Sequence, residues 1–70
     1  MSNDDMAKLK TLLGYWIEHN QEHGQEFREW ADKVTGADDV GEDLRQAAEE
    51  MDKASQFLSR ARERLEEREA

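Results

Sequence analysis

The sequence predicts an all-α protein, an antiparallel two-helix hairpin. Apolar side chains recur at alternating gaps of four and three residues along two long segments, which is the spacing of a heptad seam. Proline, which would interrupt a helix, is absent from all 70 residues. Only a short glycine-containing stretch separates the two segments, so the helices are expected to lie side by side in a single domain.

The first predicted helix covers about residues 4–34. Ser2 or Asn3 is its expected cap, because short polar side chains accept hydrogen bonds from the free N–H groups of a first turn. Only two residues of its expected seam, Asn20 and His23, are polar. The seam consists of Leu9, Leu13, Trp16, Asn20, His23, Phe27, Trp30 and Val34.

The turn is predicted at about residues 35–38 and the second helix at about residues 39–68. Gly36 suits the left-handed conformation that ends many helices. Folding the two seams together pairs residues whose numbers sum to about 74, for example Trp30 with Leu44. The second seam consists of Val40, Leu44, Ala47, Met51, Ala54, Leu58, Ala61 and Leu65.

The apolar stripe is wider than one facing helix can cover, which predicts a homodimer. Two hairpins related by a two-fold axis form a four-helix bundle, the simplest cover for such a stripe. A core of this size rarely supplies more than about 3–5 kcal/mol, which also favours association. The alternative is that these apolar residues are exposed singly at the hairpin ends. The expected interface residues are Leu12, Trp16, Ile17, Phe57 and Leu58.

Composition excludes several classes of protein. With 18 acidic and 10 basic residues the net charge is −8, so the chain lacks the basic face that nucleic-acid binding needs. The absence of cysteine excludes disulfides and cysteine-ligated zinc. No apolar run approaches the length of a membrane span, and the first residues lack the pattern of a secretion signal. A cytoplasmic protein without a membrane partner is therefore expected.

Acidic residues concentrate around the predicted turn. Residues 36–52 contain seven acids and one base, Arg45. Clustered charge of one sign can steer the approach of a basic protein partner, although many such runs are simply solvated surfaces. A docking patch for a protein partner is thus one expectation for this segment.

The two histidines of the chain suggest a metal site. His19 and His23 stand four residues apart, so one helix face presents both imidazoles to a single ion. The predicted register brings Glu26 and Glu50 together as further ligands, and such a nitrogen and oxygen set suits zinc, nickel, cobalt or iron. Alternatively, Asn20 and His23 form a hydrogen-bonded polar core layer that determines register and oligomeric state.

The same segment matches His-x-x-Glu-His, the pattern of inverted zinc peptidases, with Glu22 as the base. Those enzymes need a further metal ligand and a substrate cleft built by a larger domain. A hairpin of 70 residues is too small to supply that cleft. The sequence therefore favours a protein that is not an enzyme, with metallohydrolase activity as a third alternative.

One stretch resembles a known family. Residues 16–23 read Trp-Ile-Glu-His-Asn-Gln-Glu-His and are followed by Phe27 and Trp30. This pattern is similar to that of a small bacterial and archaeal helical-hairpin domain of unknown function. The resemblance implies a hairpin fold without an established activity. Relatives sometimes accompany histidine-rich or metal-handling segments, so the resemblance implies a similar role for His19 and His23.

Two functions follow as expectations. The first is a small acidic interaction module that self-associates and scaffolds or regulates a protein partner. The second is a transition-metal-binding accessory protein that uses His19 and His23 as ligands.

Overall fold

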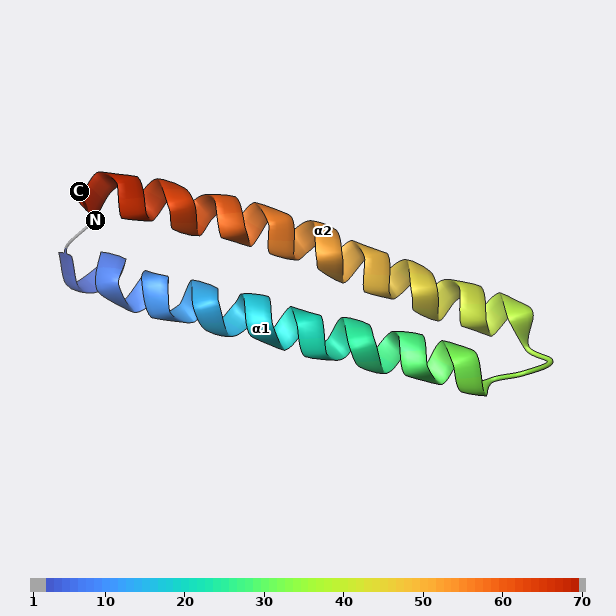
Figure 1. The fold of residues 1–70 in the computed structure, drawn as a ribbon. Coiled ribbons are helices and arrows are strands. Elements are labelled where there is room, and N and C mark those ends of the chain that lie inside the picture. The colour runs from blue at the N-terminus through green and yellow to red at the C-terminus, as the bar shows by residue number, and fades with distance from the viewer. Residues whose placement is uncertain (1–2, 70) are drawn as a thin grey trace.

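Two antiparallel helices of nearly equal length make up the fold (Figure 1). The computed structural model describes residues 3–69, with α1 at Asn3–Lys33 and α2 at Asp38–Glu69. The helices lie side by side in a rod of 52 × 15 × 14 Å. The predicted hairpin is confirmed, with helix boundaries within one residue of expectation. The cap expected at Ser2 or Asn3 involves side chains outside those described.

The turn at residues 34–37 depends on Gly36. Its φ of +85° lies in the left-handed region, which glycine enters without a Cβ clash. The N–H of Val34 donates to the carbonyl of Trp30 at 3.1 Å, and the N–H of Ala37 donates to the carbonyl of Val34 at 3.4 Å. The N–H of Gly41 in turn donates to the carbonyl of Ala37 at 3.1 Å. The first and last of these bonds extend the helical pattern at the two helix ends, and the bond from Ala37 to Val34 closes the turn.

The seam of α1 has the predicted spacing, but alternate positions lie one residue later in the chain. Trp16 and Trp30, expected in the seam, are 38 % and 57 % exposed, so their predicted burial is wrong. His23 is half-buried beside the seam, where Gly24 takes its expected place. The buried and half-buried seam residues are Leu13, Ile17, Asn20, Gly24, Phe27, Ala31 and Val34.

The seam of α2 is displaced in the same way. Val40, Ala54 and Ala61 are exposed, which overturns their predicted burial, whereas the expected leucines and Met51 lie in the seam. The buried and half-buried seam residues are Gly41, Leu44, Ala48, Met51, Ser55, Leu58, Arg62 and Leu65.

Small residues cause this displacement. A Cβ built on Gly24 would lie 3.8 Å from the carbonyl oxygen of Ala48, and one built on Gly41 would lie 3.5 Å from that of Ala31. The backbones therefore approach closely at two levels one heptad apart, where glycine and alanine fit but an indole ring does not. Residue numbers sum to 72 at both contacts, so the predicted register is nearly right.

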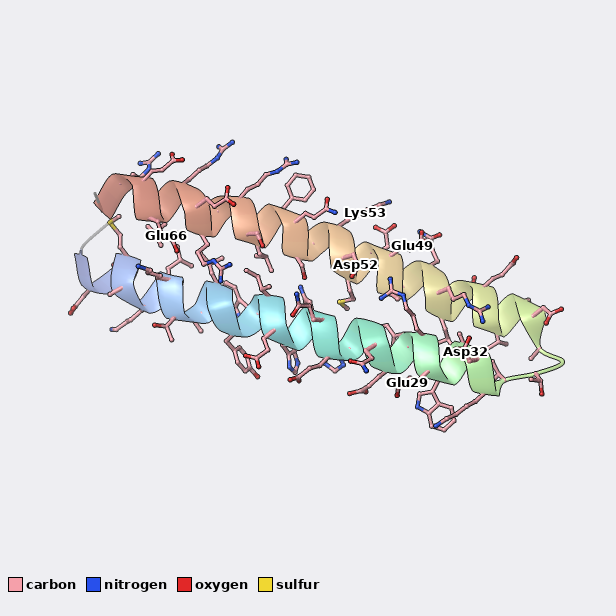
Figure 2. The ribbon with its side chains drawn as sticks, viewed as in Figure 1. Glu29, Asp32, Glu49, Asp52, Lys53 and Glu66 are labelled. Carbon is pink, nitrogen blue, oxygen red and sulfur yellow. The ribbon has the colours of Figure 1, made fainter. Side chains whose placement is uncertain are left out.

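Ion pairs join the helices along one side. Arg28 donates to Asp52 at 2.7 Å, and Arg45 donates to Asp32 at 2.9 Å. Figure 2 shows Asp32 and Asp52 among the charged side chains that extend from both helices. Because all four groups are exposed, each pair contributes at most about 1 kcal/mol, and their main effect is on register.

Two glycines provide a matched test of the backbone. Gly14 has nothing within 4 Å of an added Cβ and lies in the helical region, whereas Gly36 requires a positive φ. Gly14→Ala should stabilise the hairpin by up to about 1 kcal/mol through helix propensity. Gly36→Ala should destabilise it by about 1–2 kcal/mol. Urea unfolding followed by circular dichroism measures both, and equal effects would contradict the assigned turn.

Two alanines discriminate the observed seam from the predicted one. Ala48 is 0 % exposed against α1, whereas Ala54 is exposed. Ala48→Leu should destabilise the hairpin by about 1–3 kcal/mol, because the added carbons force the backbones apart. Ala54→Leu should not destabilise the hairpin, because the side chain at position 54 is exposed. The reverse order in thermal and urea melts would favour the predicted seam.

Candidate functional site

The candidate site is an exposed apolar surface, here named the aromatic face. Each of its side chains is at least 38 % exposed, and that of Phe57 is 65 % exposed. Contiguous apolar patches on soluble proteins commonly mark interaction sites. The aromatic face consists of Leu12, Tyr15, Trp16 and Trp30 of α1 with Val40 and Phe57 of α2.

Heptad geometry places five of these six residues on one side of the hairpin. All of them except Tyr15 come directly before a seam residue, as Trp30 comes before Ala31. Arg28 and Asp52 each come directly after one, and their ion pair joins the helices on the opposite side. Equivalent heptad positions of antiparallel helices flank the seam on the same side. The flank with the aromatic face therefore lies opposite the flank with the inter-helix ion pairs. Glu26 and Glu50, which come directly before Phe27 and Met51, also lie on the aromatic side.

Cations cover two rings of the aromatic face. Lys33 Nζ lies 4.7 Å from the ring centroid of Trp30, and the guanidinium carbon of Arg60 lies 5.0 Å from that of Phe57. Such exposed contacts contribute about 0.5–1 kcal/mol each. They offset part of the exposure of two rings, and Leu12 and Trp16 remain exposed.

A row of four rings runs along α1 beside the aromatic face. Tyr15 stacks on His19 with centroids 5.4 Å apart, and His23 stacks on Phe27 at 6.0 Å. The two imidazoles meet edge to face at 4.3 Å. This arrangement follows from the spacing of four residues between successive rings, which places each above the last on one helix face.

The two imidazoles point their Nε2 atoms at each other. These atoms are 2.9 Å apart, a hydrogen-bond distance that requires one nitrogen to donate and the other to accept. His19 is exposed and His23 is half-buried. The polar core layer expected from Asn20 and His23 therefore needs correction: Asn20 lies in the seam, but His23 lies beside it and pairs with His19.

The carboxylates expected to complete a metal site do not join the histidines. Among the described residues, no group of three or more His, Cys, Asp or Glu side chains is placed to hold one ion. Glu50 instead accepts hydrogen bonds from Lys53 at 3.2 Å and from Gln46 at 2.9 Å on its own helix. Lys53 and then Gln46 hold the pKa of Glu50 below its usual range. Glu26 is exposed on α1.

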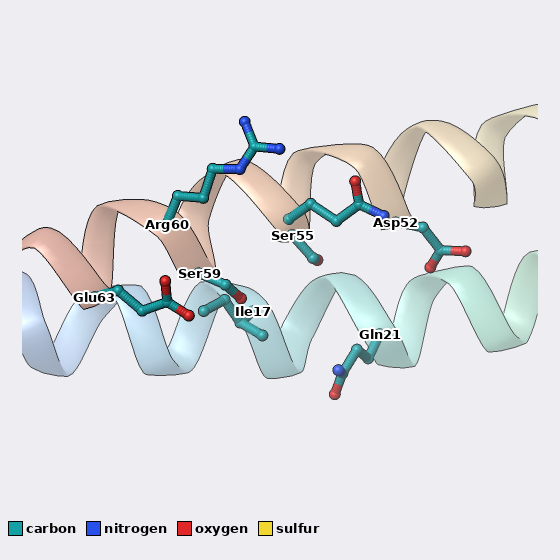
Figure 3. A pocket seen from close by; sticks show the side chains of 8 residues that line it. Ile17, Gln21, Asp52, Ser55, Ser59, Arg60 and Glu63 are labelled. Carbon is teal, nitrogen blue, oxygen red and sulfur yellow. The ribbon is translucent and has the colours of Figure 1, made fainter.

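A shallow groove of about 510 Å³ lies on the ionic side of the hairpin (Figure 3). Ser55 Oγ is buried there without a hydrogen-bond partner among the described residues. The polar side chains diverge, with Arg60 directed away from α1 and Gln21 away from α2, so they offer a ligand little to bind. The groove is lined by Ile17, Gln21, Asp52, Ser55, Gln56, Ser59, Arg60 and Glu63.

Three of the five expected interface residues are exposed as predicted: Leu12, Trp16 and Phe57. Ile17 is wrong, because it is buried against α2 inside the hairpin, and Leu58 is half-buried in the seam. Trp30 and Val40 were missed because they were assigned to the core, and Tyr15 was not assigned. For Trp30 and Val40 the signal was the spacing of small residues seven positions apart, Gly24 and Ala31 on α1 and Gly41, Ala48 and Ser55 on α2.

Neither described helix contains an apolar stretch long enough to cross a membrane.

Comparison with known proteins agrees with the resemblance found in the sequence. Residues 9–65 match the family model described as Domain of unknown function (DUF8180). The chain is 35 % identical over 57 residues to an uncharacterized protein of Archaeoglobus fulgidus, in an alignment covering 80 % of this chain and 92 % of that protein. No solved structure matches it. The family match spans most of the hairpin, including the histidine pair, and the chain belongs to the DUF8180 family.

Proposed function

We propose that this protein is a non-enzymatic helical interaction module that self-associates through the aromatic face into a four-helix bundle. The observation that carries the proposal is the contrast between a thin core and an exposed apolar surface. Among the described residues, the buried apolar side chains are Leu13, Ile17, Ala31, Ala48 and Leu65.

The core of one hairpin is small for an independent fold. Two of its five buried apolar residues are alanines, and no large side chain among the described residues is fully buried. Burial contributes about 25 cal/mol for each Å² of apolar surface, so this seam yields little stability. A second copy that covers Trp16 and Phe57 would bury rings larger than any side chain in the seam except Phe27.

The area available suits a stable dimer. A standard protein interface covers about 800 Å² on each partner. The described chain exposes 5431 Å², so such an interface needs about one seventh of it. One long side of a rod 52 Å in length provides that area. Exposed indole and phenyl rings are also the side chains that most often dominate interface energetics.

The acidic half of the hairpin is proposed to receive a basic protein partner, which the bundle scaffolds or regulates. Residues 18–52, named here the acidic half, carry 12 acidic and 3 basic residues and a net charge of −9. The remaining residues carry 6 acidic and 7 basic residues and a net charge of +1. Charge on this scale accelerates encounter with a basic partner and depends on salt.

One contact favours a second function, that of a transition-metal-binding accessory protein. The Nε2 atoms of His19 and His23 lie only 2.9 Å from each other. Imidazole nitrogens in this arrangement suit nickel, copper, cobalt or zinc.

Substitution of the aromatic face should break self-association. Trp30→Gln and Phe57→Gln should each weaken the dimer by about tenfold or more, because each removes a large exposed ring from the proposed interface. Sedimentation equilibrium in EDTA over a range of protein concentrations measures the dissociation constant. At protein concentrations above the dissociation constant, circular dichroism should show unchanged helicity, since neither ring lies in the seam.

Gln25→Ala is the matched control, because Gln25 is exposed on α1 away from the aromatic face and donates a hydrogen bond to Glu29 at 3.3 Å on its own helix. Its dissociation constant should equal that of the parent chain. A parent chain that stays monomeric at about 100 µM, the concentration range of weak complexes, contradicts the proposed self-association.

A further inference from the structure

The Nε2 atoms of the histidine pair are separated by a distance that suits a metal chelate. Imidazole nitrogens bind divalent transition metals at about 2.0–2.1 Å. With Nε2 atoms 2.9 Å apart, an ion at that distance from both would subtend an angle of about 90°. This is the angle between neighbouring ligands in square-planar and octahedral complexes, the geometries of Cu²⁺ and Ni²⁺. A tetrahedral Zn²⁺ would need the nitrogens about 0.5 Å further apart.

Neighbouring rings hold the two imidazoles in this orientation. Tyr15 stacks on His19 with an interplanar angle of 18°, and Phe27 stacks on His23 with an angle of 19°. The imidazole planes themselves lie at 85°. Because Phe27 is half-buried in the seam, the row is anchored to the hairpin core at one end. Packing of this kind reduces the ordering that metal binding would otherwise require.

One described chain offers only part of a coordination sphere. No third His, Cys, Asp or Glu side chain among the described residues joins the pair in a group that could hold an ion. Two nitrogen ligands on one helix leave two or more positions of any of these ions open. A second copy is a source of two more imidazoles.

Charge determines how two copies would lie. If both turns pointed the same way, the acidic halves would face each other with −9 against −9. If the copies ran head to tail, each acidic half would face the partner's residues outside 18–52. Those residues carry a net charge of +1. Like charges across an interface cost several kcal/mol, so the head-to-tail arrangement is favoured.

The histidine pair lies near the centre of this arrangement. α1 spans Asn3–Lys33, so its midpoint is residue 18, and the pair is centred on residue 21. A two-fold axis across the middle of the aromatic face would therefore bring the histidine pairs of both copies together. His19 follows Tyr15 and Trp16 along the same side of α1, so covering that side also covers the pair.

We propose that two copies of this chain, paired head to tail through the aromatic face, hold one divalent transition-metal ion between them, with His19 and His23 of each copy as the four nitrogen ligands. Ni²⁺ and Cu²⁺ suit the observed Nε2 separation best. The inference rests on the proposed self-association, which brings the two copies together. The choice of ion rests on the distance between the two imidazole nitrogens.

Titration of the untagged full chain with Ni²⁺ alone tests the proposal. Native mass spectrometry and isothermal calorimetry on EDTA-stripped, desalted protein should show saturation at half an equivalent, with one ion per two chains. The double variant Gln21→His, His23→Gln keeps two histidines and the net charge but places them two residues apart, on different sides of the helix. Its dissociation constant for Ni²⁺ should be at least about 100-fold higher than that of the parent chain, because the chelate is lost.

Glu22→Gln is the companion control, since it keeps the pair and alters only the carboxylate of the His-x-x-Glu-His pattern. It should bind Ni²⁺ as the parent does. Circular dichroism of both variants should match the parent, because the changed residues lie outside the seam. Saturation at one ion per chain, or binding that survives the spacing variant, would overturn the shared site.

Sedimentation with and without Ni²⁺ separates this inference from the proposed function. A dimer in EDTA that binds no Ni²⁺ overturns the metal site and leaves self-association standing. A monomer in EDTA that dimerises at half an equivalent of Ni²⁺ supports the shared site and overturns metal-free self-association. A chain that is monomeric in both and binds no ion overturns both.

Discussion

The close approach of the two backbones at Gly24 and Gly41 is the constraint on which the rest of the structure depends. Each glycine meets a carbonyl oxygen of the facing helix, that of Ala48 or of Ala31. At these two levels the seam admits only small side chains, so an indole ring cannot lie between the helices there. The surface of the protein is therefore a consequence of its core: the tryptophans are exposed because the helices pack on glycine and alanine.

Much of this fold follows from pattern alone. Spacing of four and three residues, the absence of proline and a single glycine turn predict two antiparallel helices to within one residue. Which residues form the seam was harder to predict, because two sets with the same spacing lie one residue apart on each helix. Hydrophobicity favours the set with Trp16 and Trp30, whereas close packing selects Ile17, Gly24 and Ala31. A ranking by side-chain hydrophobicity does not take into account whether a ring fits into the space between the two helices.

The candidate site was likewise predictable only in part. Local spacing on one helix correctly placed His19 beside His23, because residues four apart meet regardless of tertiary packing. Ligands expected from the other helix depended on side-chain orientation, and there Glu50 engages Lys53 and Gln46 instead. Exposure was predicted correctly where it follows directly from excess apolar surface, as at Leu12 and Phe57. Ile17 was misplaced because the seam itself was rotated.

The elongated shape of the hairpin affects how its association is read in solution. A rod of 52 × 15 × 14 Å has a higher frictional ratio than a sphere of equal mass, so a single chain diffuses as a heavier globular protein would. Pairing along the aromatic face adds thickness but little length. The assembly would therefore be more nearly isotropic than its subunit, and doubling the mass would change the hydrodynamic radius by less than it does for round proteins. Elution volume alone thus reports shape as much as stoichiometry for this chain.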